Sequence, residues 1–85
     1  MIGLMEEDNM QKLNDLNLLD KAIVEKVEAN KNIKKGFLDI GLIKGTKIKV
    51  VLISPLKDMK AYLIKGAVIA IRNEDTKDIL VRVVK

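Results

Sequence analysis

A corner built around two glycines, Gly41 and Gly45, divides the sequence into a helical part and a sheet part. Apolar residues recur at helical spacing before the corner, and from Thr46 onward they alternate as in a strand. Gly41 is placed to end a helix in the left-handed conformation, which glycine adopts easily because it has no Cβ. Leu42 can then fold back onto the last helical turn. The corner therefore predicts a short helix that leads directly into a strand.

The helix is predicted over about residues 33–40, with Asn32 as its N-cap. At about 100° per residue, Ile33, Phe37 and Ile40 share one narrow face of this helix. We therefore expect these three side chains to face the core.

Two further residues of this helix matter. Gly36 lies beside the core-facing stripe and could let the helix approach the sheet closely. Leu38 falls on the opposite side, between Lys34 and Lys35 in projection. Burial is the ordinary explanation of a single leucine, but a leucine between lysines is also a candidate contact residue.

The rest of the chain predicts mainly β structure. Strands are expected where β-branched residues alternate with polar ones, at residues 22–28, 46–54, 60–65, 67–72 and 79–84. Gly66 predicts a tight hairpin turn, and residues 73–78 predict one helical turn that begins at Asn73. Residues 10–19 fit a turn or two of helix, or a strap across a barrel opening.

About five closely spaced strands, with one short helix after the first strand, predict a small closed or nearly closed barrel. An open sheet of four or five strands that carries one helix is the alternative. We expect a flexible N-terminal arm at residues 1–10 and a single domain over residues 11–85.

Composition limits the classes of protein that this chain can belong to. Its 85 residues lie near the lower limit at which one core holds without cross-links, and the absence of Cys and His excludes disulfides and metal sites of the Cys/His kind. The longest apolar runs, residues 50–53 and 67–71, are far shorter than the roughly 20 residues that span a bilayer. With no basic leader at its start, the chain is expected to be cytoplasmic, without direct insertion into the membrane.

The residue types also argue against catalysis. The single serine, Ser54, has no plausible base, and glycines are not arranged with lysine and serine as in a phosphate-binding loop. The chain offers iron oxygen ligands only, and a flexible acidic arm explains the acidic cluster at residues 6–8. We therefore expect no enzyme activity, no cofactor and no metal site.

The charge pattern leaves several partners open. The net charge is +4, and between Lys44 and Lys65 the chain has six lysines against one acid, Asp58. A solvated face is the simplest explanation, although such a region could also meet nucleic acid, an acidic protein or anionic headgroups. Barrels that bind single strands present stacking aromatics, whereas this chain has one Phe and one Tyr. Nucleic acid is therefore not the expected partner.

The order of several short motifs resembles the ferrous iron transport protein A family. The motifs are the stretch Phe37-Leu38-Asp39-Ile40-Gly41-Leu42, then Gly45, the turn Pro55-Leu56-Lys57-Asp58, the strand end Ile69-Ala70-Ile71-Arg72 and the strand Ile79-Leu80-Val81. The resemblance covers about residues 13–84. Departures at Asp20-Lys21, Gly36 and Met59 fall on turns and surface.

This resemblance implies an SH3-like barrel that acts as a non-enzymatic accessory to a membrane-embedded ferrous iron transporter with a cytosolic GTPase part. The protein would bind that part at the inner face of the membrane and modulate iron uptake. Similar modules form the C-terminal domains of iron-dependent repressors, so a stand-alone regulatory or nucleic-acid-binding module is the alternative. The predicted partner-binding residues are Phe37, Leu38, Leu42 and Leu56. Of these, Leu38, Leu42 and Leu56 would form an apolar patch ringed by lysines if exposed together.

Overall fold

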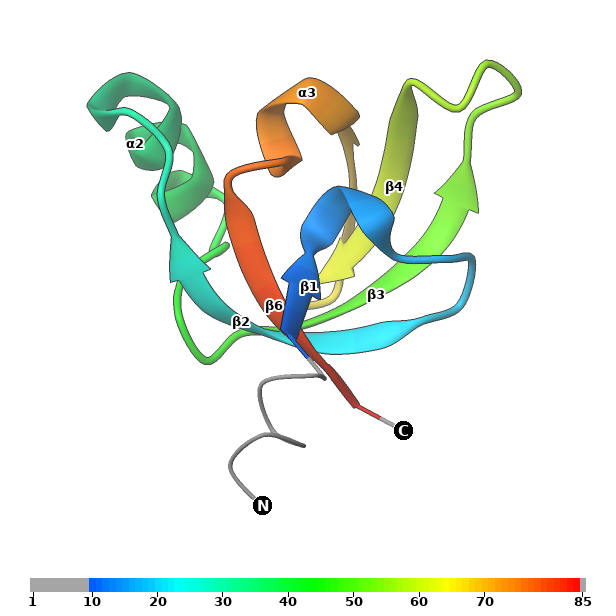
Figure 1. Cartoon of the computed structure of the whole chain (residues 1–85), viewed down its shortest axis with the longest axis horizontal. Coiled ribbons are helices and arrows are strands. Elements are labelled where there is room, and N and C mark those ends of the chain that lie inside the picture. The colour runs from blue at the N-terminus through cyan, green and yellow to red at the C-terminus, as the bar shows by residue number, and fades with distance from the viewer. Residues whose placement is uncertain (1–9, 85) are drawn as a thin grey trace.

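Alternating apolar residues fold the chain into one antiparallel sheet that curls into an SH3-like barrel (Figure 1). The computed structural model describes residues 10–84. The strands are β1 (Met10–Lys12), β2 (Lys21–Val27), β3 (Lys47–Ile53), β4 (Met59–Ile64), β5 (Ala67–Arg72) and β6 (Ile79–Val84). The helices are η1 (Leu13–Asp15, a 3-10 turn), α2 (Lys31–Asp39) and α3 (Asn73–Thr76).

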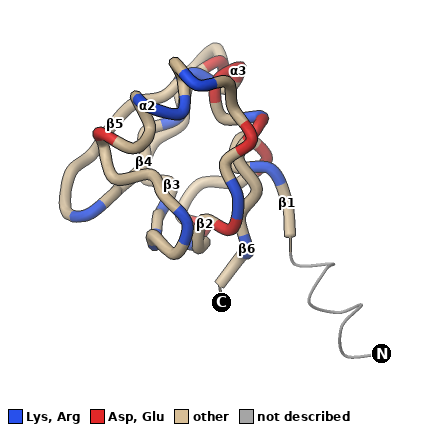
Figure 2. Tube along the Cα trace, turned by 90° about the vertical axis from the view of Figure 1, so that its left-hand side faces the viewer, with Lys and Arg blue, Asp and Glu red and all other residues tan. Residues whose placement is uncertain are grey.

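The strands lie in the order β1-β6-β2-β3-β4-β5. Figure 2 shows β1 and β5, the first and last strands in that order, on opposite sides of the molecule. Gly66 makes the predicted β4–β5 hairpin turn together with Lys65, and both residues have positive φ. The predicted barrel is confirmed.

The strand count and the position of the helix differ from the prediction. Residues 10–12 form β1, which pairs antiparallel with β6, so the described chain has six strands and α2 follows the second of them. Three residues are too few to show a strand period, and only the pairing with β6 makes them a strand. The arm predicted for residues 1–10 lies outside the described residues, except Met10 in β1.

After β1, Leu13 in η1 and Leu16 just after it are buried in the core, so this segment combines a single 3-10 turn with a strap that packs on the barrel. Lys60, on β4, donates from its Nζ to the Asn14 carbonyl and so ties this strap to the sheet.

Helix α2 begins earlier than predicted. Its N-cap is Asn30, whose side-chain oxygen accepts from the Ile33 amide at 3.0 Å, while Asn32 lies inside the first turn. Both asparagines suit a cap by residue type, and the sequence does not distinguish them, because the choice depends on which one has extended backbone. Phe37 packs in the core, and Ile33 and Ile40 pack against it, as predicted.

Gly36 does not face the sheet as suggested. It is exposed on α2, and a Cβ added there would meet no atom within 4 Å.

The end of α2 is the predicted glycine cap. Gly41 has φ +89°, and its amide donates to the Leu38 carbonyl at 3.0 Å. The Leu42 amide donates to the Phe37 carbonyl at 2.8 Å, which completes a Schellman motif. Thr46 adds a hydrogen bond from its hydroxyl to the Gly41 carbonyl at 2.9 Å. The corner therefore fixes how α2 is joined to β3.

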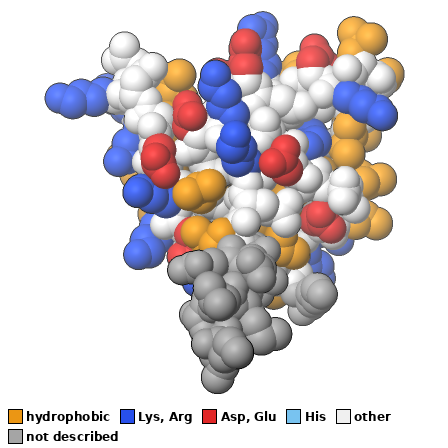
Figure 3. Space-filling view, viewed as in Figure 1, with side chains coloured by type: hydrophobic (Ala, Val, Ile, Leu, Met, Phe, Trp, Pro, Cys, Tyr) orange, Lys and Arg blue, Asp and Glu red, His pale blue; other side chains and the backbone are white. Residues whose placement is uncertain are grey.

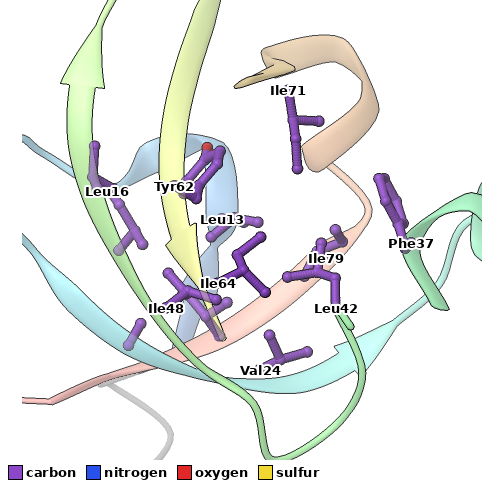
Figure 4. Packing of buried hydrophobic residues seen from close by; sticks show 13 residues of the cluster. Leu13, Leu16, Val24, Phe37, Leu42, Ile48, Tyr62, Ile64, Ile71 and Ile79 are labelled. Carbon is purple, nitrogen blue, oxygen red and sulfur yellow. The ribbon is translucent and has the colours of Figure 1, made fainter. Parts of the chain in front are cut away.

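The core lies inside the curl of the sheet, between the strap and α2 (Figure 4). Tyr62 is its largest fully buried side chain, and the aliphatic side chains around it include Leu13, Ile64 and Ile79. Phe37 closes the α2 end of this cluster, on the same side as Leu42 and Ile79 (Figure 4).

Candidate partner-binding surface

A hollow of about 490 Å³ lies between α2, the end of β2 and the glycine corner. Its apolar residues are Val27, Leu38, Leu42 and Ile43, and its charged residues are Glu25, Lys26, Lys34 and Lys44. We call this feature the α2 hollow. It joins an apolar lining with a mainly basic rim, which suits an apolar contact flanked by acidic groups.

Each apolar residue of the α2 hollow is positioned by a different element. Leu38 projects from the outer side of α2, opposite the core-facing stripe, and is 59% exposed. Ile43 follows the Schellman motif and is 39% exposed. Leu42 is only 1% exposed: its amide donates a hydrogen bond to the Phe37 carbonyl, and its side chain packs in the core cluster. Leu42 is therefore the floor of the α2 hollow, and Leu38 and Ile43 are its accessible walls.

The four predicted partner-binding residues do not form one surface. Leu38 and Leu42 meet in the α2 hollow, whereas Phe37 is 6% exposed and belongs to the core. Leu56 is 85% exposed, but it lies in the β3–β4 loop, at the other end of the molecule's longest axis from α2 (Figure 1). A partner-binding role for these residues stays a prediction, and Leu38 is the exposed one that lies in the α2 hollow.

Ile43 is the contact candidate that the sequence reasoning missed. It stands between the two corner glycines, next to the buried Leu42. Leu42 makes the buried apolar contact of the cap, whereas Ile43, the next residue, is partly exposed. The cap motif in the sequence could have supplied this signal.

The segment before β2, the end of β3 and the β3–β4 loop lie at the end of the molecule opposite α2, and they carry exposed leucines (Figure 1). These leucines are Leu18, Leu19, Leu52 and Leu56. The Leu19 amide donates to the Val50 carbonyl at 2.8 Å, which holds the β1–β2 loop against β3. Figure 3 shows hydrophobic side chains along this edge, whereas basic side chains project around the α2 end. The two ends of the molecule therefore differ in surface chemistry.

The acids near the α2 hollow are already partnered. Glu25 pairs with Arg82 at 3.2 Å, and Glu28 pairs with Lys26 at 3.7 Å on an exposed surface. Lys34 and Lys44 have no ion pair with any residue that the structure describes. The rim is therefore able to meet acidic groups of a partner.

Two buried polar groups belong to the barrel and not to the α2 hollow. Burial lowers the pKa of Lys60, while the nearby carboxylates of Asp15 and Asp20 raise it. Burial raises the pKa of Tyr62, and the neighbouring Thr76 opposes this shift. The Tyr62 hydroxyl has no hydrogen-bond partner of good geometry among residues 10–84. Lys60 has a structural partner in the strap, and Tyr62 fills the core.

Within residues 10–84, no three His, Cys, Asp or Glu side chains come together as a metal site would require. In the same part of the chain, no helix is long and apolar enough to cross a bilayer.

Comparison with known proteins places the chain in a family. A relative from Porphyromonas gingivalis, the Fe(2+) transport protein A/Fe(2+) transporter FeoB fusion protein, is 32% identical over 73 residues. This match covers 86% of the chain but only 9% of that relative. The solution structure of a FeoA protein from Chlorobium tepidum is 29% identical, with a TM-score of 0.83 over 88% of this chain and 71% of the other.

A manganese-dependent transcriptional repressor shares the fold alone. It is 17% identical, with a TM-score of 0.80 over 88% of this chain and 42% of the repressor. The model of the FeoA domain matches residues 11–83, nearly the whole described chain. The resemblance seen in the sequence is confirmed, and the chain belongs to the FeoA domain family.

Proposed function

We propose that this protein is a non-enzymatic, cytoplasmic accessory protein of ferrous iron transport. It binds the cytosolic GTPase part of a membrane ferrous iron transporter through the α2 hollow and modulates iron uptake. The family match supports the transport role, and so does the P. gingivalis relative, which by its name joins transport protein A and the transporter in one chain. Such a fusion is expected where two parts act at the same place.

The α2 hollow carries the binding proposal. Leu38 is a large apolar side chain, 59% exposed in the last turn of a helix that has polar neighbours on its outer side. Leu38 and Ile43 are exposed at the walls of the α2 hollow, and the buried Leu42 forms its floor. A partner's apolar side chain could therefore bind there without rearrangement of the hollow. The unpaired lysines at the rim favour an acidic partner face and steer its approach.

The direct test is binding of the purified protein to the cytosolic GTPase part of the transporter from the same organism. Leu38→Gln is expected to weaken binding by about ten-fold or more, because an apolar anchor is lost and a polar group must be desolvated. Leu56→Gln is the matched control, since it makes the same change at a more exposed leucine at the opposite end. Equal binding by the wild type and Leu38→Gln would exclude the α2 hollow as the docking site.

A stand-alone regulatory or nucleic-acid-binding module is the second candidate, and the likeness to the repressor fold favours it at the level of fold only. This function predicts an affinity for oligonucleotides that falls steeply with salt concentration. Absence of binding to single- and double-stranded oligonucleotides at low salt would remove it. The same titration supports it if binding is found and the transporter's cytosolic part does not bind.

A further inference from the structure

A second hollow, of about 880 Å³, lies over β2, β3 and the β4–β5 hairpin. Five lysines line it: Lys21, Lys44, Lys47, Lys49 and Lys65. We call it the lysine groove. We propose that the lysine groove binds an acidic, extended polypeptide segment of a partner. This proposal goes beyond the α2 hollow, and its test does not need the transporter.

The register of the sheet explains how the lysines come together. Lys21 on β2 lies directly opposite Lys49 on β3, and Lys49 lies directly opposite Leu63 on β4. The row continues to Val84 beyond Lys21 and to Val68 beyond Leu63. One cross-strand row on the outer face thus has two lysines at its centre and aliphatic side chains at both ends.

Two features of the lysine groove are locally unfavourable for folding. Like charges directly opposite each other in a sheet are destabilising, and Lys21 and Lys49 are such a pair. Lys65 has φ 49° in the β4–β5 turn, at a position that favours Asn or Gly. Such local costs are often retained where a residue serves binding, and here all three residues are lysines of one groove.

No carboxylate of the described chain lines the lysine groove. None of the five lysines forms an ion pair with another residue in the range 10–84. An anionic partner would therefore gain attraction without first breaking an ion pair of the described barrel.

The shape and lining favour a polypeptide over other polyanions. Nucleic-acid strands are held by exposed aromatics, and the only aromatic residues of the chain, Phe37 and Tyr62, are buried. A bilayer surface is flat, whereas the lysine groove is hollowed and carries aliphatic residues at its ends. Five neighbouring strands about 4.8 Å apart span roughly 19 Å, the length of about six extended residues. Carboxylates at the centre of such a segment would meet Lys21 and Lys49, and its aliphatic ends would meet Val84 at one end of the row and Val68 at the other.

The proposal is tested with a dye-labelled hexapeptide that has two Glu and two Asp residues between a terminal Val and a terminal Leu. Fluorescence anisotropy with the full chain is expected to show binding that weakens as salt is added. Lys21→Gln combined with Lys49→Gln is expected to weaken binding by about ten-fold or more. The matched control is Lys31→Gln with Lys35→Gln, which removes the same charge from exposed positions on α2 and should leave binding within about two-fold.

A second variant keeps the test valid if the first does not fold. Lys47→Gln combined with Lys65→Asn removes two lysines of the groove, and Asn suits the left-handed turn position. It is expected to weaken peptide binding like the first variant. Equal losses in groove and control variants, or no binding at low salt, would overturn the proposal. Tighter binding of a single-stranded oligonucleotide of equal charge, or of anionic phospholipid vesicles, would also overturn it.

Discussion

Gly36 inside α2 and Gly41 just after it show how the role of a residue depends on its backbone conformation. Gly36 is exposed in the helix interior with open space around it, so Gly36→Ala is expected to stabilise the protein by about 0.5–1 kcal/mol. Gly41 has φ +89°, and Gly41→Ala is expected to cost about 1–2 kcal/mol, because a side chain disfavours the left-handed conformation. The new Cβ would also lie 3.0 Å from Cδ of Lys65, which is flexible enough to move aside.

Chemical denaturation of both variants measures this contrast. The change in midpoint at constant slope gives the free energy of unfolding for each variant. If Gly36→Ala were destabilising, Gly36 would have a packing role that its exposed position does not show. If Gly41→Ala were neutral, the Schellman motif would not be what ends α2.

At the level of elements, the N-cap of α2 is Asn30, two residues before Asn32, which the sequence pattern predicted. Asn30→Ala is expected to lower the free energy of unfolding by about 1 kcal/mol, because the Ile33 amide loses its acceptor. Asn32→Ala, inside the first turn, is the matched control and should change stability little, since Ala favours a helix. Thermal unfolding followed by circular dichroism distinguishes the two. An equal loss from both variants would contradict the observed cap.

The elements that the sequence predicted well are those whose signal is local. The Schellman motif at Gly41 and the hairpin at Gly66 depend on glycine conformation, and the stripe of Ile33, Phe37 and Ile40 depends on helical period. Strand β1 was missed because three residues have no period, and their structure comes from pairing with β6. Pairing between distant segments is the information that local patterns lack.

At the scale of the whole molecule, local sequence patterns also fail to show which distant residues come together in a binding surface. The exposure of Leu38 followed from its position on the outer side of α2. Its separation from Leu56 depends on where α2 and the β3–β4 loop lie in the folded barrel, which a local pattern does not show. The facing of Lys21 and Lys49 is set by the register of β2 against β3, across 28 positions of sequence. The sequence showed a basic segment, whereas the strand register and the hollow over it show that its lysines share one groove with Lys21.

The buried Tyr62 predicts how the stability of the whole barrel changes with pH. Its pKa is raised by burial, so the folded state holds the phenol proton more tightly than the unfolded chain, in which the pKa is about 10. This contribution is complete below about pH 10 and is lost as the pH rises through the raised pKa of the folded state. Unfolding should therefore become easier above about pH 10 in the wild type.

Tyr62→Phe isolates this effect. The variant also removes a buried hydroxyl without a well-aligned partner, so at neutral pH it is expected to be as stable as the wild type, or more stable by up to about 1 kcal/mol. Lys60, whose lowered pKa makes stability rise with pH, is present in both proteins and cannot account for a difference between them.

Urea denaturation between neutral and strongly alkaline pH should show the advantage of Tyr62→Phe growing above about pH 10. Because Tyr62 is the single tyrosine, tyrosinate absorbance reports its ionisation alone. A parallel pH dependence of the two proteins, with tyrosinate formed at the pKa of the unfolded chain, would show that Tyr62 is accessible to solvent.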